Sequence, residues 1–106
     1  MVKRGEVWLV ALDPTVGVEI QKTRPCLIVS PPEMHDHLRI VIATPMTTGS
    51  RPAGFRVPVN FKGKDGLVLL DQIRALDKQR LVKRLGSVSD AVLTTVLQTL
   101  ERVFAA

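Results

Sequence analysis

Two loop edges of the chain carry side chains that could act on a phosphate group. The first is the segment GVEIQKTRP, residues 17–25, in which Arg24 stands directly before Pro25. Because a proline disfavours the helical conformation in the residue before it, we expect Arg24 to be extended, at the mouth of a strand. Its forked, permanently charged donors suit phosphate oxygens. The alternative is an ion pair between Arg24 and Glu19 at the base of the loop.

The second edge is the segment TPMTTG, residues 44–49, where an apolar run leaves the core. Threonine hydroxyls in loops commonly cap backbone groups. The same hydroxyls could also donate hydrogen bonds to a phosphate, and the sequence leaves both roles open.

Positive charge is concentrated in the second half of the chain. Residues 54–106 hold 9 basic and 5 acidic side chains, against 6 and 5 in residues 1–53. The excess lies mainly in Arg74, Lys78, Arg80, Lys83 and Arg84. Such a stretch is either a solvated face around a strand and turn or a surface that tracks phosphates.

Other chemistries find little support. The two imidazoles of His35-Asp36-His37 would need a further ligand to hold zinc, and we interpret this segment as a solvated loop. Cys26 lies in an apolar run, where burial would raise the pKa of the thiol and hide it. No phosphate-cradling GxxxxGK(S/T) loop occurs, and no carboxylate pair recurs in a suggestive context. We therefore expect neither a metal site nor a cofactor.

The elements that must position these residues are mostly short strands. Apolar runs bounded by turn residues predict strands over residues 6–11, 25–29, 38–43, 55–59 and 67–73, with a less regular one over 81–85. An apolar period of three to four then predicts a closing amphipathic helix over residues 93–104, with Ser89 as its N-cap. The pattern is mainly β, and it does not choose between an SH3-like barrel, an OB-like barrel and a small sandwich.

Three finer predictions concern single residues. Pro58 indicates that the fourth strand lies at a sheet edge, because proline cannot donate to a ladder. Residues 63–66 are expected to form a turn. Trp8 and Phe104 are assigned to the core rather than to a stacking surface.

Length and composition set the frame. The chain has 106 residues, 45% of them apolar, which is typical of one globular domain over residues 1–106. Its net charge of +5 permits a nucleic-acid partner without requiring one. No run of about 18 apolar residues exists, so no membrane span is expected. A lone cysteine excludes an intrachain disulfide, and the expected location is the cytoplasm.

The sequence resembles the MazF/PemK (Kid) family of toxin endoribonucleases from toxin–antitoxin systems. The resemblance runs from RGEVWLVALDPTVGVEIQKTRP through PCLIVSP and PMTTG to DGLVLLDQIRALDKQRLVKRLG and the closing helix. The combination of GxExxxxRP with a later strand that ends in Thr-Thr is specific. The resemblance implies an SH3-like β-barrel with a C-terminal helix, a homodimer, and metal-independent cleavage of single-stranded RNA. It also implies an acidic, disordered antitoxin that folds on binding.

The family's residues carry over one at a time. The resemblance implies that Arg24 and Thr47 are catalytic and that Glu19 is the loop glutamate of the site. Its Asp-Gln pair matches Asp71-Gln72, which we place in the fifth strand. Kid-like members have an arginine two residues before that aspartate, and this chain has Leu69 there, so a catalytic role of Asp71 does not carry over.

RNA supplies its own nucleophile, the 2′-hydroxyl, whose attack leaves a 2′,3′-cyclic phosphate and a 5′-hydroxyl. Arg24 and Thr47 would stabilise the negatively charged transition state, and Glu19 would help to deprotonate the nucleophile. The residues expected to bind the RNA are Gly17, Thr48, Asp71, Gln72, Arg74, Lys78 and Arg80.

Two other functions stay open at this point. CcdB-type gyrase poisons share the barrel, so the chain could be a toxin that binds a protein target. It could also be an RNA-binding module without turnover.

Overall fold

Seven short strands and a C-terminal helix make up most of the protein. The computed structural model describes residues 1–106. The strands are β1 (Glu6–Ala11), β2 (Thr23–Ile28), β3 (Ile40–Thr47), β4 (Arg56–Phe61), β5 (Lys64–Leu69), β6 (Arg74–Asp77) and β7 (Leu81–Ser87). The helices are α1 (Pro32–His35) and α2 (Asp90–Phe104), and 3-10 turns cover Leu70–Gln72 and Lys78–Arg80.

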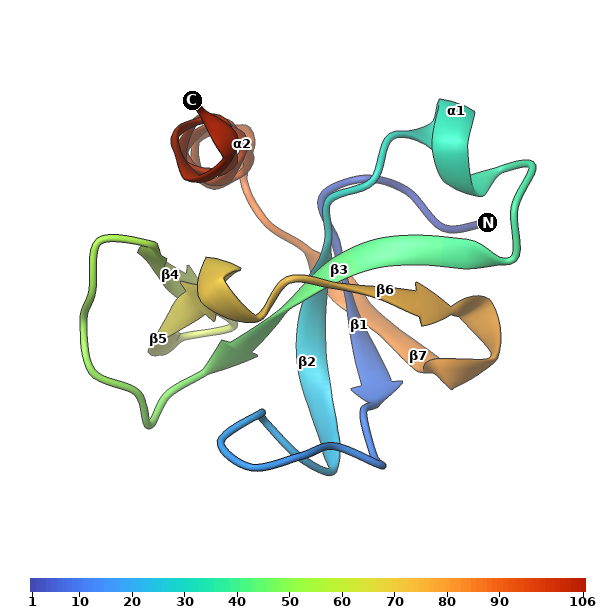
Figure 1. Cartoon of the computed structure of the whole chain (residues 1–106), viewed down its shortest axis with the longest axis horizontal. Helices are drawn as coiled ribbons and strands as arrows, with labels where there is room; N and C mark the ends of the chain where they lie inside the picture. The colour runs from blue at the N-terminus through green and yellow to red at the C-terminus, as the bar shows by residue number, and fades with distance from the viewer.

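The strands form one antiparallel sheet that curls into a half-barrel (Figure 1). The order is β4-β5-β3-β2-β1-β7, and β6 pairs with β3 outside this path. The long strand β3 therefore has β2 on one edge and both β6 and β5 on the other. This confirms the mainly β barrel with one C-terminal helix. In Figure 1 the loop 12–22 lies at the lower end of the sheet, and the loop 48–55 runs up its left side from the end of β3 to β4.

The β4–β5 hairpin sets a register that matters for the site. Its turn is Lys62-Gly63, with φ of 51° and 82°. Positive φ at both central residues is typical of the two-residue hairpin turn whose twist matches the strands. The prediction of a turn at residues 63–66 placed it too late in the chain, because Gly66 already lies inside β5. The register pairs Arg56 with Leu69. As predicted, the strand that carries Pro58 lies at the sheet edge.

The predicted fifth strand is two strands with a break between them. The chain runs along β3 as β5, leaves the ladder in the 3-10 turn Leu70–Gln72, and returns as β6. At the break the hydroxyl of buried Thr44 donates to the carbonyl of Leu69 at 2.6 Å. This side-chain bond satisfies a buried backbone group where the strand leaves the sheet. Asp71 and Gln72 consequently lie on a turn, so the prediction that they belong to the fifth strand was wrong.

The segment around His35 is not a solvated loop. Pro32 begins α1, where its fixed φ favours a helical turn, and the turn directs His35 inward. His35 is fully buried; Nδ1 lies 2.8 Å from Ser30 Oγ and Nε2 lies 2.8 Å from the carbonyl of Val2. His37 is exposed, so the prediction was wrong for His35 only.

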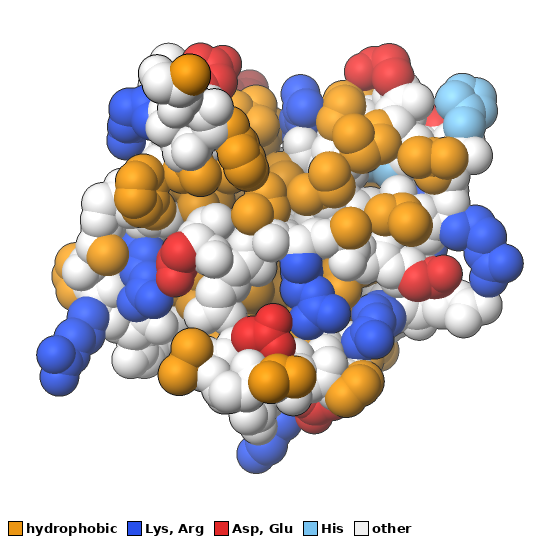
Figure 2. All heavy atoms as spheres, viewed as in Figure 1, with side chains coloured by type: hydrophobic (Ala, Val, Ile, Leu, Met, Phe, Trp, Pro, Cys, Tyr) orange, Lys and Arg blue, Asp and Glu red, His pale blue; other side chains and the backbone are white.

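The core lies on both faces of the curled sheet, and α2 covers one of them; Figure 2 shows hydrophobic side chains gathered between α2 and the sheet. Val96 and Leu100 of α2 join a cluster with residues of β1 and β5, such as Val7 and Val68. Ser89 caps the helix as predicted and accepts from the N–H of Val92 at 3.2 Å. No helix is long and apolar enough to span a membrane.

Two predictions about core residues have different outcomes. Trp8 is half-buried and packs against a second cluster of buried apolar residues, separate from the one that α2 joins, which contains Cys26. Burial raises the pKa of the Cys26 thiol to about 12, as expected for a structural cysteine, although the charge of Arg74 acts in the opposite direction. Phe104 does not belong to the core, because it lies on the last turn of α2 and is 73% exposed.

Candidate functional site

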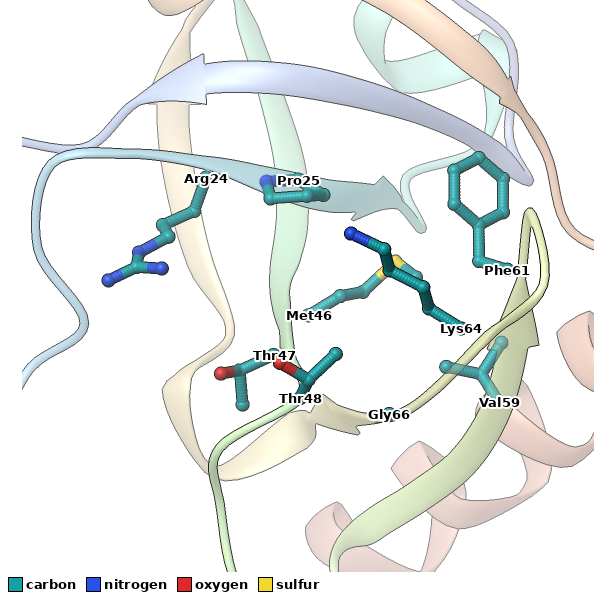
Figure 3. Close-up of a pocket in the computed structure, with 9 residues that line it drawn as sticks. All are labelled: Arg24, Pro25, Met46, Thr47, Thr48, Val59, Phe61, Lys64 and Gly66. Carbon is teal, nitrogen blue, oxygen red and sulfur yellow. The ribbon is translucent and has the colours of Figure 1, made fainter.

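Two cavities adjoin along β3. The first, about 210 Å³ in volume, is lined by Arg24, Pro25, Met46, Thr47, Thr48, Val59, Phe61, Lys64 and Gly66 (Figure 3). The second, about 370 Å³, is lined by Leu12, Val18, Glu19, Ile20, Pro45, Arg56, Asp71, Gln72, Ile73 and Arg74. They are named here the Arg24 cavity and the Asp71 cavity. Successive residues Pro45 and Met46 of β3 line one each, so both cavities border the end of this strand.

Arg24 projects from the start of β2, extended before Pro25 as the sequence predicts. Its Nε donates to the carbonyl of Gln21 at 3.2 Å, which orients the guanidinium. The two terminal nitrogens have no protein acceptor, and the side chain is exposed. No ion pair with Glu19 forms, so the guanidinium is available to an anion.

Thr47 is the last residue of β3, and Arg24 lies on the neighbouring strand β2. The register pairs Cys26 with Pro45, and continuing it by two residues brings Arg24 beside Thr47. Figure 3 shows both side chains on the same side of the cavity. Oγ1 of Thr47 accepts from the N–H of Gly49 at 3.2 Å, and its own proton has no protein acceptor. Thr47 thus caps the loop and still offers a donor, which joins the two roles that the sequence left open.

Gly66 permits this arrangement of β3 and β5. A Cβ at Gly66 would lie 2.7 Å from the carbonyl oxygen of Thr47. Real Cβ atoms do not approach backbone oxygens so closely, so the absence of a side chain at Gly66 lets β5 approach the end of β3.

Glu19 lies in the loop between β1 and β2 and lines the Asp71 cavity rather than the Arg24 cavity. Its Oε1 accepts from the N–H of Val16 at 2.6 Å, and its own N–H donates to the carbonyl of Val16 at 3.2 Å. The second carboxylate oxygen has no protein donor. The carboxylate therefore stiffens its own turn and keeps one oxygen for a ligand. Gly17, in the same turn with φ of 61°, lines neither cavity.

Asp71 is paired with an arginine that sequence reasoning missed. Arg56 Nε donates to Asp71 Oδ1 at 3.1 Å, and Nη2 donates to Oδ2 at 3.0 Å. The hydrogen bonds from Arg56 hold the pKa of the Asp71 carboxyl below its usual range, although partial burial acts in the opposite direction. Because Arg56 is the cross-strand neighbour of Leu69, an arginine reaches Asp71 from β4 although position 69 holds a leucine.

Of the remaining predicted residues, some line a cavity, and others donate hydrogen bonds to the protein's own backbone. Thr48 lines the Arg24 cavity, and Gln72 and Arg74 line the Asp71 cavity. Lys78 and Arg80 line neither cavity, because Lys78 Nζ donates to the carbonyl of His35 and Arg80 Nη1 donates to the carbonyls of Ala11 and Asp13.

Lys64 is a further cation of the Arg24 cavity that the sequence did not single out. The two-residue turn at Lys62-Gly63 is the signal that could have found it, because such a turn fixes the positions of Lys64 and Arg56. No group of three or more His, Cys, Asp or Glu side chains is gathered as a metal site would need.

Comparisons with known proteins agree with this fold. Residues 3–104 match the family described as PemK-like, MazF-like toxin of type II toxin-antitoxin system. The chain is 42% identical to endoribonuclease PemK of Escherichia coli, over 95% of this chain and 80% of that protein. It is 32% identical to endoribonuclease MazF of Staphylococcus epidermidis, over 95% and 89% of the two chains.

Solved structures give the same result. MazF from Deinococcus radiodurans superposes with a TM-score of 0.87 at 26% identity, over 99% of this chain and 97% of that one. An endoribonuclease from a mycobacterial species, solved in complex with its cognate antitoxin, gives 0.81 at 27% identity, over 96% and 93%. On its sequence, its curled sheet and its C-terminal helix, the chain belongs to the PemK-like, MazF-like toxin family of type II toxin–antitoxin systems.

Proposed function

We propose that this toxin-family endoribonuclease cleaves single-stranded RNA at short sequences, without a metal ion, by attack of the 2′-hydroxyl on the adjacent phosphate. The observation that carries the proposal is the Arg24 cavity. There an arginine with free terminal nitrogens and a threonine with a free hydroxyl proton lie on adjacent strands. The products are a 2′,3′-cyclic phosphate and a 5′-hydroxyl.

Arg24 and Thr47 would act on the phosphate. Attack of the 2′-oxygen forms a pentavalent phosphorane with additional negative charge on its equatorial oxygens. The fork of Arg24 offers two parallel N–H donors and a full positive charge, and Thr47 offers a neutral donor beside it. Donors already held in place stabilise this charge without reorganising during the reaction.

Glu19 is the proposed base for the 2′-hydroxyl. Its second oxygen is free, and the turn closed by its first oxygen orients the carboxylate. Because Glu19 lines the Asp71 cavity, the RNA would pass around the end of β3, which borders both cavities, with its scissile phosphate near Arg24. Arg24 would also stabilise the charge on the departing 5′-oxygen, which takes a proton from water to become the 5′-hydroxyl.

Polar groups around the two cavities would bind the nucleotides that flank the scissile phosphate. Thr48 and Lys64 flank the Arg24 cavity, and Asp71, Gln72 and Arg74 line the other. Splayed bases of a single strand expose edges that such groups can read. Arg80 would act on the RNA indirectly, by holding the start of the loop 12–22.

The partners proposed for this chain are a second copy of itself and an acidic antitoxin. The cavities are small and open, and two chains would provide a longer RNA path. The mycobacterial relative is solved with its cognate antitoxin. A net charge of +5 favours an acidic segment that covers the same path.

The test is incubation of the purified protein with a long single-stranded RNA in excess EDTA. We expect discrete fragments that carry 5′-hydroxyl ends at a recurring short sequence. Intact RNA with a mobility shift would indicate an RNA-binding module instead, and intact RNA without a shift would favour a protein target.

Contaminating ribonucleases leave similar ends, so the matched control is Arg24→Ala purified in the same way. Thr47→Val is a second control, because it keeps the shape of the side chain and removes the hydroxyl. Both should be folded and leave the RNA intact at the recurring sequence. Cleavage there by both variants at the wild-type rate would refute the assignment of the site.

A further inference from the structure

The 3-10 turn Leu70–Gln72 lies between the two long loops that border the candidate site. One loop, residues 12–22, joins β1 to β2 and carries Glu19; the other, residues 48–55, joins β3 to β4 and begins beside Thr47. Neither loop contains a strand or helix. Loops of this kind hold a defined conformation only where side chains tie them to the scaffold.

Arg56 ties the second loop to the turn. Its Nε and Nη2 donate to the two oxygens of Asp71, and its Nη1 donates to the carbonyl of Arg51 at 3.1 Å. The backbone supports the same junction, because the N–H of Leu70 donates to the carbonyl of Phe55 at 3.1 Å. The guanidinium of Arg56 therefore donates through all three of its nitrogens, to Asp71 on the turn and to Arg51 on the loop.

Gln72 ties the first loop to the same turn. Its Oε1 accepts from the N–H of Ile20 at 2.7 Å, across 52 residues of sequence. Ile20 directly follows Glu19. A rotation of the turn that moved Asp71 would therefore move the anchor of the loop that carries the proposed base.

We propose that Arg56 is a positioning residue of the RNA site: by holding Asp71 and the Arg51 carbonyl together, it fixes the turn Leu70–Gln72 and, through Gln72, the loop that carries Glu19. The proposal rests on the proposed function for its effect on cleavage. Its structural part, the coupling of two loops through one arginine, does not depend on that function.

The geometry favours a positioning role over direct contact with RNA. The side chain of Arg56 is 22% exposed, and three of its five N–H groups already have protein acceptors. A direct phosphate contact would contribute mainly to RNA affinity. Loss of a positioning contact lowers the rate of the bound complex instead, and a displacement of about 1 Å at a reacting group can cost on the order of 100-fold.

The experiment compares Arg56→Ala and Arg56→Lys with Arg102→Ala, which removes an equal charge from an exposed position on α2. Three quantities are measured in each protein: the single-turnover cleavage rate, the affinity for an RNA made uncleavable by a 2′-deoxy substitution, and backbone amide hydrogen exchange. The N–H of Ile20 is the reporter amide. The N–H of Leu27 in β2 serves as the internal reference.

In Arg56→Ala we expect cleavage to fall by about 10- to 100-fold while the affinity for uncleavable RNA changes by a much smaller factor. Exchange at Ile20 should accelerate and exchange at Leu27 should not. Arg56→Lys keeps the charge but cannot donate two parallel bonds to Asp71. Its cleavage rate and its exchange at Ile20 should therefore lie between those of Arg56→Ala and wild type. Arg102→Ala should match wild type in all three.

Unchanged exchange at Ile20 in Arg56→Ala would overturn the proposal, as would weakened RNA affinity with an unchanged single-turnover rate. If the wild-type protein does not cleave RNA at all, the proposed function fails. The exchange measurement still decides whether Arg56 couples the loops, so the two failures are distinguishable.

Discussion

At the scale of single residues, the chemistry of the site depends on which donors are already occupied. Arg24 uses one of its nitrogens on the Gln21 carbonyl and leaves the other two free, whereas Arg56 uses all three nitrogens within the protein. The charge of the two arginines does not distinguish them, but their occupied donors do. This difference is the basis for proposing a catalytic role for Arg24 and a positioning role for Arg56.

The first prediction concerns the fork of Arg24. Arg24→Ala should lower single-turnover cleavage by about 10²- to 10³-fold, the usual effect of removing one preorganised donor to an oxyanion. Arg24→Lys should recover only a small part of this loss, since an ammonium cannot donate two parallel bonds. The free energy of unfolding should change by about 0.5 kcal/mol or less, because the side chain is exposed. Full activity of Arg24→Lys would show that charge alone suffices.

The second prediction concerns Glu19. In Glu19→Gln the amide oxygen can still accept from the N–H of Val16, so the turn should survive. The amide cannot take a proton, and we expect single-turnover cleavage to fall by about 10²-fold or more at neutral pH. Urea unfolding checks that stability is unchanged. Wild-type cleavage by Glu19→Gln at every pH would remove Glu19 from the mechanism.

At the scale of elements, strand packing decides where the site residues lie. Thr47 is held at the end of β3 because β5 approaches closely at Gly66, which has no side chain. The same approach brings the β4–β5 hairpin, with Lys64 and Arg56, beside the site. The geometry of the site is therefore a consequence of how three strands meet.

The third prediction follows from this approach. In Gly66→Ala the new methyl group would lie 2.7 Å from the Thr47 carbonyl oxygen, so β3 and β5 must separate. We expect a loss of about 1–3 kcal/mol in the free energy of unfolding, together with slower cleavage because Thr47 moves. At Gly54 an added methyl meets nothing within 4 Å, so Gly54→Ala should leave the stability unchanged. Equal stability of the two variants would contradict the close approach.

The sequence predicts the features of the fold and of the site that depend on neighbouring residues in the chain. The extended Arg24 follows from Pro25, and the cap of α2 follows from Ser89. The Arg56–Asp71 pair could not be predicted in this way, because it depends on the register of a hairpin whose turn was placed two residues too late. The break after β5 depends on the hydroxyl of Thr44, 25 residues away.

Local sequence patterns also could not predict which residues at the ends of helices are buried. The period of α2 assigns Phe104 to the buried face, but the last turn leaves it exposed. His35 looked like a loop residue, and it is buried because Ser30 and the Val2 carbonyl satisfy both ring nitrogens. These outcomes depend on contacts between distant segments, which a single sequence does not reveal.

At the scale of the whole molecule, one buried carboxylate links the first strand of the chain to the last. Glu6 of β1 is 6% exposed; its Oε1 accepts from the N–H of Lys3 at 2.7 Å and from Trp8 Nε1 at 3.2 Å, and its Oε2 accepts from Arg84 of β7 at 2.6 Å. Burial acts to raise the pKa of Glu6, and the hydrogen bonds from Lys3, Trp8 and Arg84 outweigh it and hold the pKa below its usual range.

The fourth prediction is that this carboxylate makes stability depend on pH. Because the pKa is lower in the folded state than in the unfolded state, Glu6 stabilises the fold above the usual carboxyl range, and this contribution is lost as the pH falls through the folded pKa. Glu6→Gln places an amide against the Arg84 guanidinium and should cost about 1–3 kcal/mol at pH 7. Urea unfolding of both proteins between pH 7 and acid conditions should show this difference narrowing as the pH falls. A difference that stays constant with pH would show that the charge of Glu6 is not its cause.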